Sequence, residues 1–213
     1  IRGAGRMGAG IAYVSAKAGM DVVLKDISQE QAEKGKAYSH KLLQKKVSRG
    51  FMSESDRDAF LDHIHPTTSA DDLRGCDLII EAVFENPELK ARVTREAEAM
   101  IEDDKIFASN TSTLPISILA QATKRPRQFI GIHFFSPVDK MPLVEIIVGE
   151  ETDDRTIAAA VDYVTQIKKV PIVVNDSQGF FTSRVFGTYT GEGALLLSEG
   201  VPATMIEHVA RRV

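Results

Sequence analysis

The sequence lacks the features that define several classes of protein. Among its 213 residues Cys76 is the single cysteine, so an internal disulfide and a cysteine metal cluster are excluded, and we expect no bound metal. Every apolar run is shorter than the roughly 18 residues of a membrane-spanning helix, and no signal peptide opens the chain. A formal net charge of -4 gives no reason to expect nucleic acid or a membrane surface as a partner. A globular protein of a reducing, cytoplasm-like compartment fits best.

The chain does have a glycine-rich turn at its start. Gly3, Gly5 and Gly8 follow the Gly-x-Gly-x-x-Gly spacing, with Arg6 and Met7 between the second and third glycines. In this spacing the first glycine makes a sharp turn, the second lets the backbone approach a pyrophosphate, and the third lets helix and strand pack closely. The helix that follows points its free N–H groups at the same pyrophosphate. These residues therefore predict a dinucleotide site.

An acidic residue follows at the distance that such a site requires. The apolar run that starts at Val22 ends at Asp26, about 20 residues beyond the turn, where a carboxylate can accept hydrogen bonds from the adenosine ribose. The alternative is a solvated residue that caps the next helix. In the first interpretation the carboxylate repels a 2′-phosphate, so NAD is favoured over NADP.

A long basic helix is expected next, over residues 29–48. Ser28 fits its N-cap, because Gln31 stands at the third position after it. Together with Arg49, which follows it directly, the segment carries six basic side chains against two acidic ones, Glu30 and Glu33. The basic residues are Lys34, Lys36, Lys41, Lys45, Lys46 and Arg49. This surplus is either a solvated face or a landing site for a phosphorylated part of the substrate.

Strands and helices then alternate, which predicts a doubly wound α/β domain. We expect strands at 77–83 and 105–109, a helix from Pro87 to about residue 101, and another helix near Pro115. Ligands of such sheets bind beyond the carboxyl ends of the strands. The polar residues that follow the strands are therefore expected beside the glycine turn: Glu85, Lys90, Asn110, Thr111 and Ser112. Capping of a helix would explain any one of the polar residues at 109–113, but not all five.

Two apolar runs, 129–134 and 143–148, flank a loop that has prolines at both ends. If the runs pair antiparallel about a centre at Asp139, His133 lies opposite Glu145. Opposed side chains of this kind have Cβ atoms about 4.5–5.5 Å apart, so a carboxylate can hold an imidazole. A lone histidine on an apolar strand is usually a core residue. A carboxylate aimed at it beside a dinucleotide crevice favours a catalytic pair instead.

The remaining segments predict a change of architecture near residue 175. A helix over 153–168 and a strand over 170–174 precede a hinge at 175–179, and helices are expected at 180–197 and 201–213. We therefore expect a nucleotide-binding domain at 1–175, with a truncated first strand, and the incomplete beginning of a helical domain at 176–213. Only two residues precede Gly3 and the chain stops inside a helix, which indicates a fragment.

Taken together, the motifs resemble the L-3-hydroxyacyl-CoA dehydrogenases of fatty-acid β-oxidation over essentially the whole chain. The segments that carry the resemblance are 3–8, 80–85, 109–112, 133–137, 143–145 and 179–181. Residues 133–145 look most like the dehydrogenase part of multifunctional enzymes that also carry an enoyl-CoA hydratase. The resemblance implies a Rossmann-type NAD-binding domain, with a mostly parallel sheet and an antiparallel end, followed by an all-helical domain. It also implies an acyl-CoA substrate, a homodimer or multifunctional complex, and a bacterial-like cytoplasmic location, with an organellar matrix as the alternative.

The same resemblance implies roles for individual residues. His133 would be the general base, Glu145 its partner, and Ser112 a hydrogen-bond donor to the substrate oxygen. Glu85, Lys90 and Asn110 would line the NAD and substrate site. The basic helix would receive the CoA portion, with Lys46 and Ser183 as candidate substrate residues. The chain departs from the family at two positions, because Ser136 and Ser183 stand where the family has Asn.

Two other functions stay open at this point. One is a short-chain β-hydroxyacid or imine-type dehydrogenase, which uses the same nucleotide domain but commonly a lysine as proton donor. The other is an NAD-binding relative with a structural or sensing role. The sequence leaves undecided the acyl chain length, the oligomeric state, a fused hydratase domain and the activity of the fragment.

Overall fold

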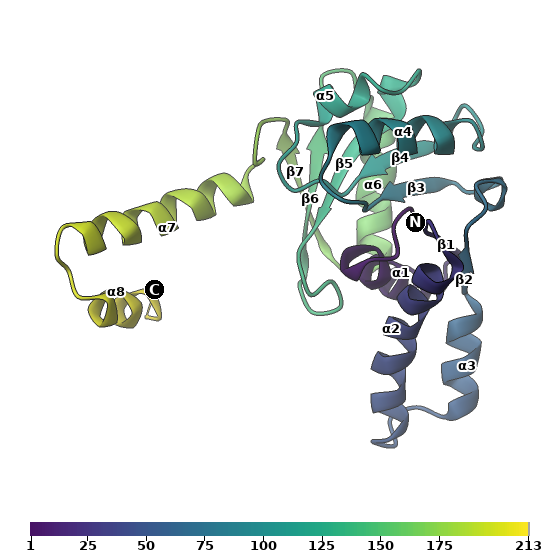
Figure 1. Cartoon of the computed structure of the whole chain (residues 1–213), viewed down its shortest axis with the longest axis horizontal. Helices are drawn as coiled ribbons and strands as arrows, with labels where there is room; N and C mark the ends of the chain where they lie inside the picture. The colour runs from purple at the N-terminus through teal and green to yellow at the C-terminus, as the bar shows by residue number, and fades with distance from the viewer. Residues whose placement is uncertain (213) are drawn as a thin grey trace.

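The computed structural model describes residues 1–212, which form a sheet covered by helices and a helical arm that leaves it (Figure 1). The strands are β1 (Val22–Lys25), β2 (Ile64–Thr67), β3 (Leu78–Glu81), β4 (Ile106–Ser109), β5 (Phe129–Phe134), β6 (Leu143–Val148) and β7 (Val170–Asn175). The helices are α1 (Arg6–Lys17), α2 (Gln29–Val47), α3 (Glu54–Asp62), α4 (Pro87–Glu98), α5 (Ile116–Ala120), α6 (Asp154–Gln166), α7 (Thr182–Ser198) and α8 (Ala203–Ala210).

The sheet is parallel except at one pair, which confirms the predicted fold class. β1 pairs with β2, and the other strands follow the order β3-β4-β5-β6-β7, with β5 and β6 antiparallel. Arg2 joins the two parts, because it forms parallel bridges with Lys25 of β1 and with Glu81 of β3. Residues 1–3 thus occupy the strand position between β1 and β3 and lead directly into the glycine turn.

The core has two halves, one on each face of the sheet. Neighbouring strand residues alternate between them, because successive side chains of a strand point to opposite faces. Ile80 packs in the half that contains α1 and α6, whereas Ile79 packs in the half that contains α4 and α5. Ile146 and Ile147 divide in the same way. Burial on both faces explains why these strands read as continuous apolar runs.

Element boundaries differ slightly from the predicted ones. The side chain of Ser28 accepts the N–H of Gln31 at 3.3 Å and so begins α2 as expected. The helix expected to reach residue 101 ends at Glu98, and the helix expected to reach 168 ends at Gln166. In the second case the chain turns at Lys168, which has a φ of 59°. The strand expected to end at 174 includes Asn175.

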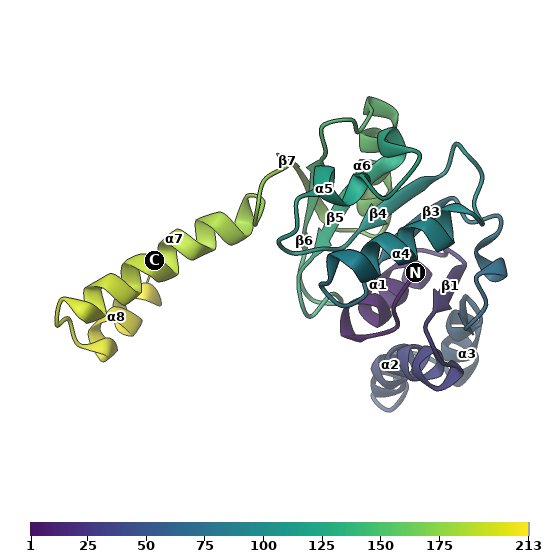
Figure 2. The same ribbon diagram turned by 45° about the horizontal axis from the view of Figure 1, so that its top comes forward.

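Helices α7 and α8 project away from the sheet (Figures 1 and 2). Neither helix has a buried residue among those described. The helix expected from residue 180 begins at Thr182, because Gly179 and Phe180 both adopt positive φ angles and turn the chain first. Of the helix expected over 201–213, residues 203–210 are helical, and residue 213 lies outside the described part. No helix within residues 1–212 has the length and hydropathy needed to cross a membrane.

Candidate active site

The glycine turn has the geometry of a dinucleotide cradle. A Cβ on Gly3, whose φ is 98°, would lie 2.7 Å from the backbone oxygen of Ala82, and one on Gly8 would lie 1.7 Å from that of Gly3. A Cβ on Gly5 would meet nothing within 4 Å. The turn therefore needs two glycines for its own packing, while Gly5 faces open space. Because no side chain caps the start of α1, the N–H groups at Arg6 and Met7 are available to an anion.

Asp26 is fixed against this turn. One carboxylate oxygen accepts the N–H of Ala4 at 2.6 Å and the other accepts the N–H of Ile27 at 2.6 Å. The alternative that Asp26 caps the next helix is wrong, because Ser28 provides that cap. A carboxylate has about four acceptor sites, so two remain for ribose hydroxyls. The donors at the turn and the acceptors at Asp26 together fit a dinucleotide.

A buried ion cluster joins the ends of β3 and α4. Lys90 is only 2% exposed, and its Nζ lies 2.9 and 3.0 Å from the two carboxylate oxygens of Glu81 and 3.0 Å from Oε2 of Glu85. Glu81 also accepts hydrogen bonds from the hydroxyl of Ser109 and the N–H of Val83. Because an ammonium has three donors, all of those on Lys90 are used within the protein. Its geometry is that of a residue that holds Glu85 in place.

Glu85 in turn holds the loop that carries Ser112. Its Oε1 accepts the hydroxyl of Thr111 and the N–H of Ser112, the latter at 2.9 Å. Burial alone raises the pKa of Glu85, but the hydrogen bond from Thr111 and the charge of Lys90 outweigh it, so this pKa lies below its ordinary value. Glu85 is therefore ionised at neutral pH, and Ser112 stays exposed at the carboxyl edge of the sheet.

Asn110 links the ends of two neighbouring strands. Its side-chain oxygen accepts the N–H of Phe134 at 2.9 Å, and its own N–H donates to the backbone oxygen of Glu81. The loop after β5 also lies against α1, because a Cβ on Gly10 would be 2.8 Å from Cβ of Val138. The glycine turn, the polar loops and the end of β5 are thus parts of one edge of the sheet.

The predicted pairing of His133 with Glu145 is confirmed. The two residues are partners in the antiparallel register, and Nδ1 of His133 lies 2.7 Å from Oε2 of Glu145. His133 is 5% exposed and Glu145 is fully buried. Because a carboxylate only accepts, Nδ1 carries the proton in this assignment and Nε2 is left as an acceptor. The rings of Phe135 and Phe180 lie 4.6 and 5.9 Å from the imidazole, centre to centre.

Glu145 is also bonded to the start of α7. Its Oε1 accepts the N–H groups of Phe181 and Thr182 at 3.1 and 2.8 Å, and its Oε2 accepts the hydroxyl of Thr182 at 2.8 Å. Burial raises the pKa of Glu145, but the hydrogen bonds from His133 and Thr182 outweigh it, so the pKa is lower than usual. The imidazole therefore faces an ionised carboxylate.

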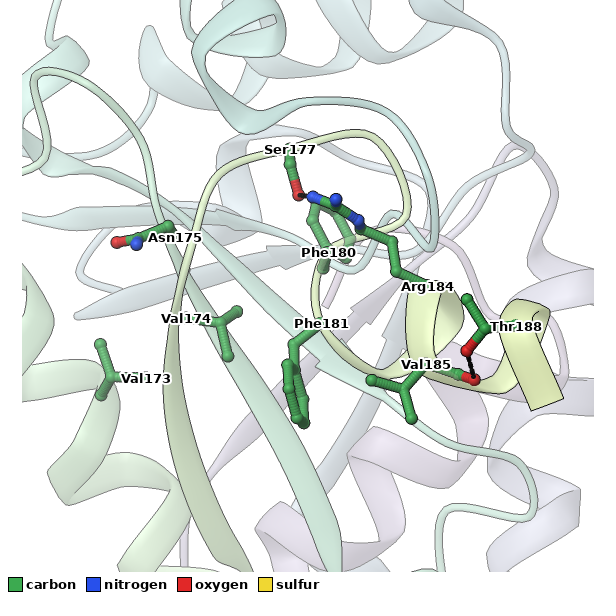
Figure 3. A pocket seen from close by; sticks show the side chains of 9 residues that line it. All are labelled: Val173, Val174, Asn175, Ser177, Phe180, Phe181, Arg184, Val185 and Thr188. Carbon is green, nitrogen blue, oxygen red and sulfur yellow. Dashed lines mark hydrogen bonds between the residues drawn. The ribbon is translucent and has the colours of Figure 1, made fainter.

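A cavity of about 580 Å³ lies between β7 and the start of α7. Figure 3 shows Val173 and Val174 of β7 on one side and Arg184 and Val185 of α7 on the other. Phe180 lines the cavity and also contacts the imidazole of His133. At Phe180 the site is therefore bordered by a hollow of mixed polar and apolar lining at the base of the helical arm.

The two remaining candidates, Lys46 and Ser183, and the family departure at Ser136 lie in different surroundings. Lys46 is half-buried on α2, where its Nζ donates to the hydroxyl of Tyr13 at 3.2 Å. Ser183 is half-buried in the first turn of α7. Ser136 precedes Pro137 through a cis peptide bond in the loop after β5. Within residues 1–212, Lys46 forms no hydrogen bond with another predicted site residue.

Sequence reasoning assigned no role to Glu81 or Thr182. Glu81 could have been noticed as an acid inside an apolar strand, since such a group must be paired when buried. Thr182 gives no comparable signal, because its neighbour Glu145 is 37 positions away in the sequence.

Comparison with known proteins places the chain in a family. Residues 1–177 match the model described as 3-hydroxyacyl-CoA dehydrogenase, NAD binding domain. The chain is 44% identical over 212 residues to the fatty acid oxidation complex subunit alpha of Psychrobacter arcticus, and 44% identical to that of Colwellia psychrerythraea. These matches cover all of this chain but 30% and 29% of the relatives, so the chain spans about a third of their length or less.

Solved structures give the same result. The (S)-3-hydroxybutyryl-CoA dehydrogenase PaaH1 of Ralstonia eutropha is 40% identical with a TM-score of 0.91, over 95% of this chain and 71% of that one. The 3-hydroxybutyryl-CoA dehydrogenase of Escherichia coli is 32% identical with a TM-score of 0.91, over 95% of this chain and 43% of that one. The chain therefore belongs to the family of 3-hydroxyacyl-CoA dehydrogenase NAD-binding domains.

Proposed function

We propose that this chain provides the NAD-dependent oxidation of L-3-hydroxyacyl-CoA to 3-ketoacyl-CoA in fatty-acid β-oxidation. The observation that carries the proposal is the contact between His133 and Glu145, 2.7 Å long, at the edge of the sheet that also holds the glycine turn. This arrangement leaves Nε2 of the imidazole free to accept a proton. Family membership and the names of the relatives support the same reaction.

The side chains divide the reaction between them. Nε2 of His133 takes the proton of the C3 hydroxyl, as an imidazole is suited to do near pH 7. Glu145 keeps Nδ1 protonated and stabilises the imidazolium that forms, as in other histidine–acid pairs. The exposed hydroxyl of Ser112 orients the substrate oxygen. NAD, when bound, supplies the acceptor for the hydride from C3.

The residues that would hold NAD surround the first turn of α1. Gly3, Gly5, Arg6, Met7 and Gly8 form the cradle for the pyrophosphate, and Asp26 receives the ribose hydroxyls. Lys90 and Glu85 keep the Ser112 loop at the same edge, and Asn110 ties that edge to the strand of His133. A carboxylate at the ribose favours NAD over NADP, because a 2′-phosphate would meet a like charge.

We also propose a division of the chain into an NAD-binding domain at 1–175 and the beginning of a helical domain at 176–213. The exposed side chains of α7 and α8 support it, since a helix normally buries an apolar stripe. The acyl-CoA would bind at the junction of the two parts, with the CoA portion near α2. Relatives named as subunits of a fatty acid oxidation complex support assembly into such a complex or a homodimer, and bacterial relatives support a cytoplasmic location.

The test is NADH formation from 3-hydroxyacyl-CoA by the intact enzyme that contains this chain, with acyl groups of several lengths. His133→Gln should lower kcat by roughly 10²–10⁴-fold, the usual contribution of a positioned general base. The matched control is His65→Gln, because His65 is exposed on β2. Near-normal turnover by His133→Gln would contradict the proposal. NAD binding without oxidation of any 3-hydroxyacyl-CoA would point instead to a structural or sensing relative or to a dehydrogenase of another substrate.

A further inference from the structure

The start of α7 and the imidazole of His133 bind the same carboxylate. We propose that Thr182 is a positioning residue that limits how strongly Glu145 holds a proton on His133, and thereby keeps this imidazole available as a base. The inference rests on the proposed function only for its catalytic consequence. The geometry that carries it lies in the hydrogen bonds of Glu145.

Glu145 receives four hydrogen bonds, and three of them come from the N-cap residue Phe181 and the first residue of α7, Thr182. The N–H groups of Phe181 and Thr182 bind Oε1, whereas the hydroxyl of Thr182 and Nδ1 of His133 both bind Oε2. The oxygen that faces the imidazole is therefore shared between two donors. The turn at Gly179 and Phe180, with φ angles of 77° and 51°, aims the first N–H groups of α7 at the carboxylate.

Among residues 1–212, His133 is the one titratable side chain that forms a hydrogen bond or ion pair with Glu145. On β5 the titratable group that faces it is His133, and on β7 its partner in the register is the apolar Ile172. From the start of α7 it meets two N–H groups and one hydroxyl. The carboxylate of Glu145 thus accepts hydrogen bonds both from the imidazole and from the neutral donors at the start of α7.

This division has a predictable effect on proton affinity. A buried carboxylate beside an imidazole stabilises the imidazolium, so the imidazole keeps its proton up to a higher pH. While it is protonated, it cannot act as a base. Each additional donor on the carboxylate draws charge away from the imidazole and weakens that effect. Because the Thr182 hydroxyl binds the same oxygen as Nδ1, its removal should strengthen the hold of Glu145 on the proton. The two backbone N–H groups on Oε1 would keep the carboxylate in place.

The experiment compares Thr182→Val, which keeps the shape but removes the hydroxyl, with Thr182→Ser, which keeps the hydroxyl. Both are made in the intact enzyme. Thr190→Val is the matched control, because the Thr190 hydroxyl bonds only to backbone oxygens within α7. Two quantities are measured: the pH dependence of kcat/KM, and the NMR titration of the His133 imidazole, assigned with His133→Gln.

We expect Thr182→Val to move the acid limb of the profile and the imidazole titration upward by about 0.5–1 pH unit. Thr182→Ser and Thr190→Val should leave both where they are in the unsubstituted protein. A Thr182→Val protein with an unchanged or lowered titration would overturn the inference. The NMR readout needs no substrate, so a protein that fails to oxidise 3-hydroxyacyl-CoA would refute the proposed function and still decide the role of Thr182.

Discussion

Nζ of Lys90 lies 2.9 Å from Oε1 of Glu81, and both side chains are almost fully buried. An ion pair at this depth is maintained only when each charge is fully bonded, because each ion has lost its hydration. Lys90 meets this condition through Glu85, and Glu81 meets it through Ser109 and Val83. The ion cluster therefore connects the interior of the sheet with the loop that carries Ser112.

Loss of the Lys90 charge should destabilise the fold. Lys90→Met leaves the buried carboxylate of Glu81 without its cation, so the free energy of unfolding should fall by about 3–5 kcal/mol. Urea denaturation followed by circular dichroism measures this loss. The comparison variant is Lys105→Met. The acidic partners of Lys105 are largely exposed, so this substitution should lower the free energy of unfolding far less. Equal losses of unfolding free energy in the two variants would show that the buried ion cluster stabilises the fold no more than an exposed ion pair does.

Substitutions at two glycines of the turn should affect different properties: stability at Gly8 and NAD binding at Gly5. Gly8→Ala puts a Cβ into the backbone oxygen of Gly3 and should cost about 3 kcal/mol or more of unfolding free energy. Gly5→Ala meets no atom within 4 Å, so its melting temperature should stay near that of the unsubstituted protein. Its Kd for NAD should nevertheless rise about tenfold or more, because the added methyl occupies the approach to the pyrophosphate. Calorimetric titration with NAD and a thermal melt of each variant decide the matter, and unaltered NAD affinity in Gly5→Ala would count against the cradle.

Asp26 should determine the choice between dinucleotides. Asp26→Ala removes the charge that repels a 2′-phosphate, so the ratio of kcat/KM for NAD to that for NADP should fall about tenfold, while kcat with NAD changes less. Asp21→Ala is the matched control, because Asp21 is an exposed acid at the other end of the same strand. A preference for NAD that survives in Asp26→Ala would place the ribose elsewhere.

Glu85 should make part of the stability depend on pH. Its pKa is lower in the folded protein than its ordinary value of 4.5, so the unfolded chain takes up a proton first as the pH falls. Its stabilising contribution is therefore fully present above about pH 4.5 to 5, and it is lost as the pH falls through the lower folded value. Glu85→Gln should be less stable than the unsubstituted protein at pH 7, and the difference should shrink below pH 4.5. Denaturation curves between pH 7 and pH 3 measure it, with Glu88→Gln, an exposed acid on α4, as the control that should show no such convergence.

Several features of the molecule follow from local sequence rules. The spacing of Gly3, Gly5 and Gly8 predicts the turn, because Gly3 and Gly8 leave no room for a Cβ and Gly5 keeps the approach to the turn open. The pairing of His133 with Glu145 follows from the period of a strand and the centre of one loop. Alternating apolar runs and capped helices predict the parallel sheet. All of these depend on residues close together in the chain.

Other features depend on how whole elements pack. The contact of Lys90 with both Glu81 and Glu85 requires α4 to lie over the end of β3, and the bond from Thr182 to Glu145 requires the base of α7 to meet β6. The period of a strand or a helix does not predict such contacts, because they join different elements whose relative placement is set by packing. The sequence by itself thus determined the glycine turn, the sheet and the histidine–carboxylate pair. Only the tertiary structure decided which donors hold that carboxylate, because the turn at Gly179 and Phe180 sets where the start of α7 lies against β6.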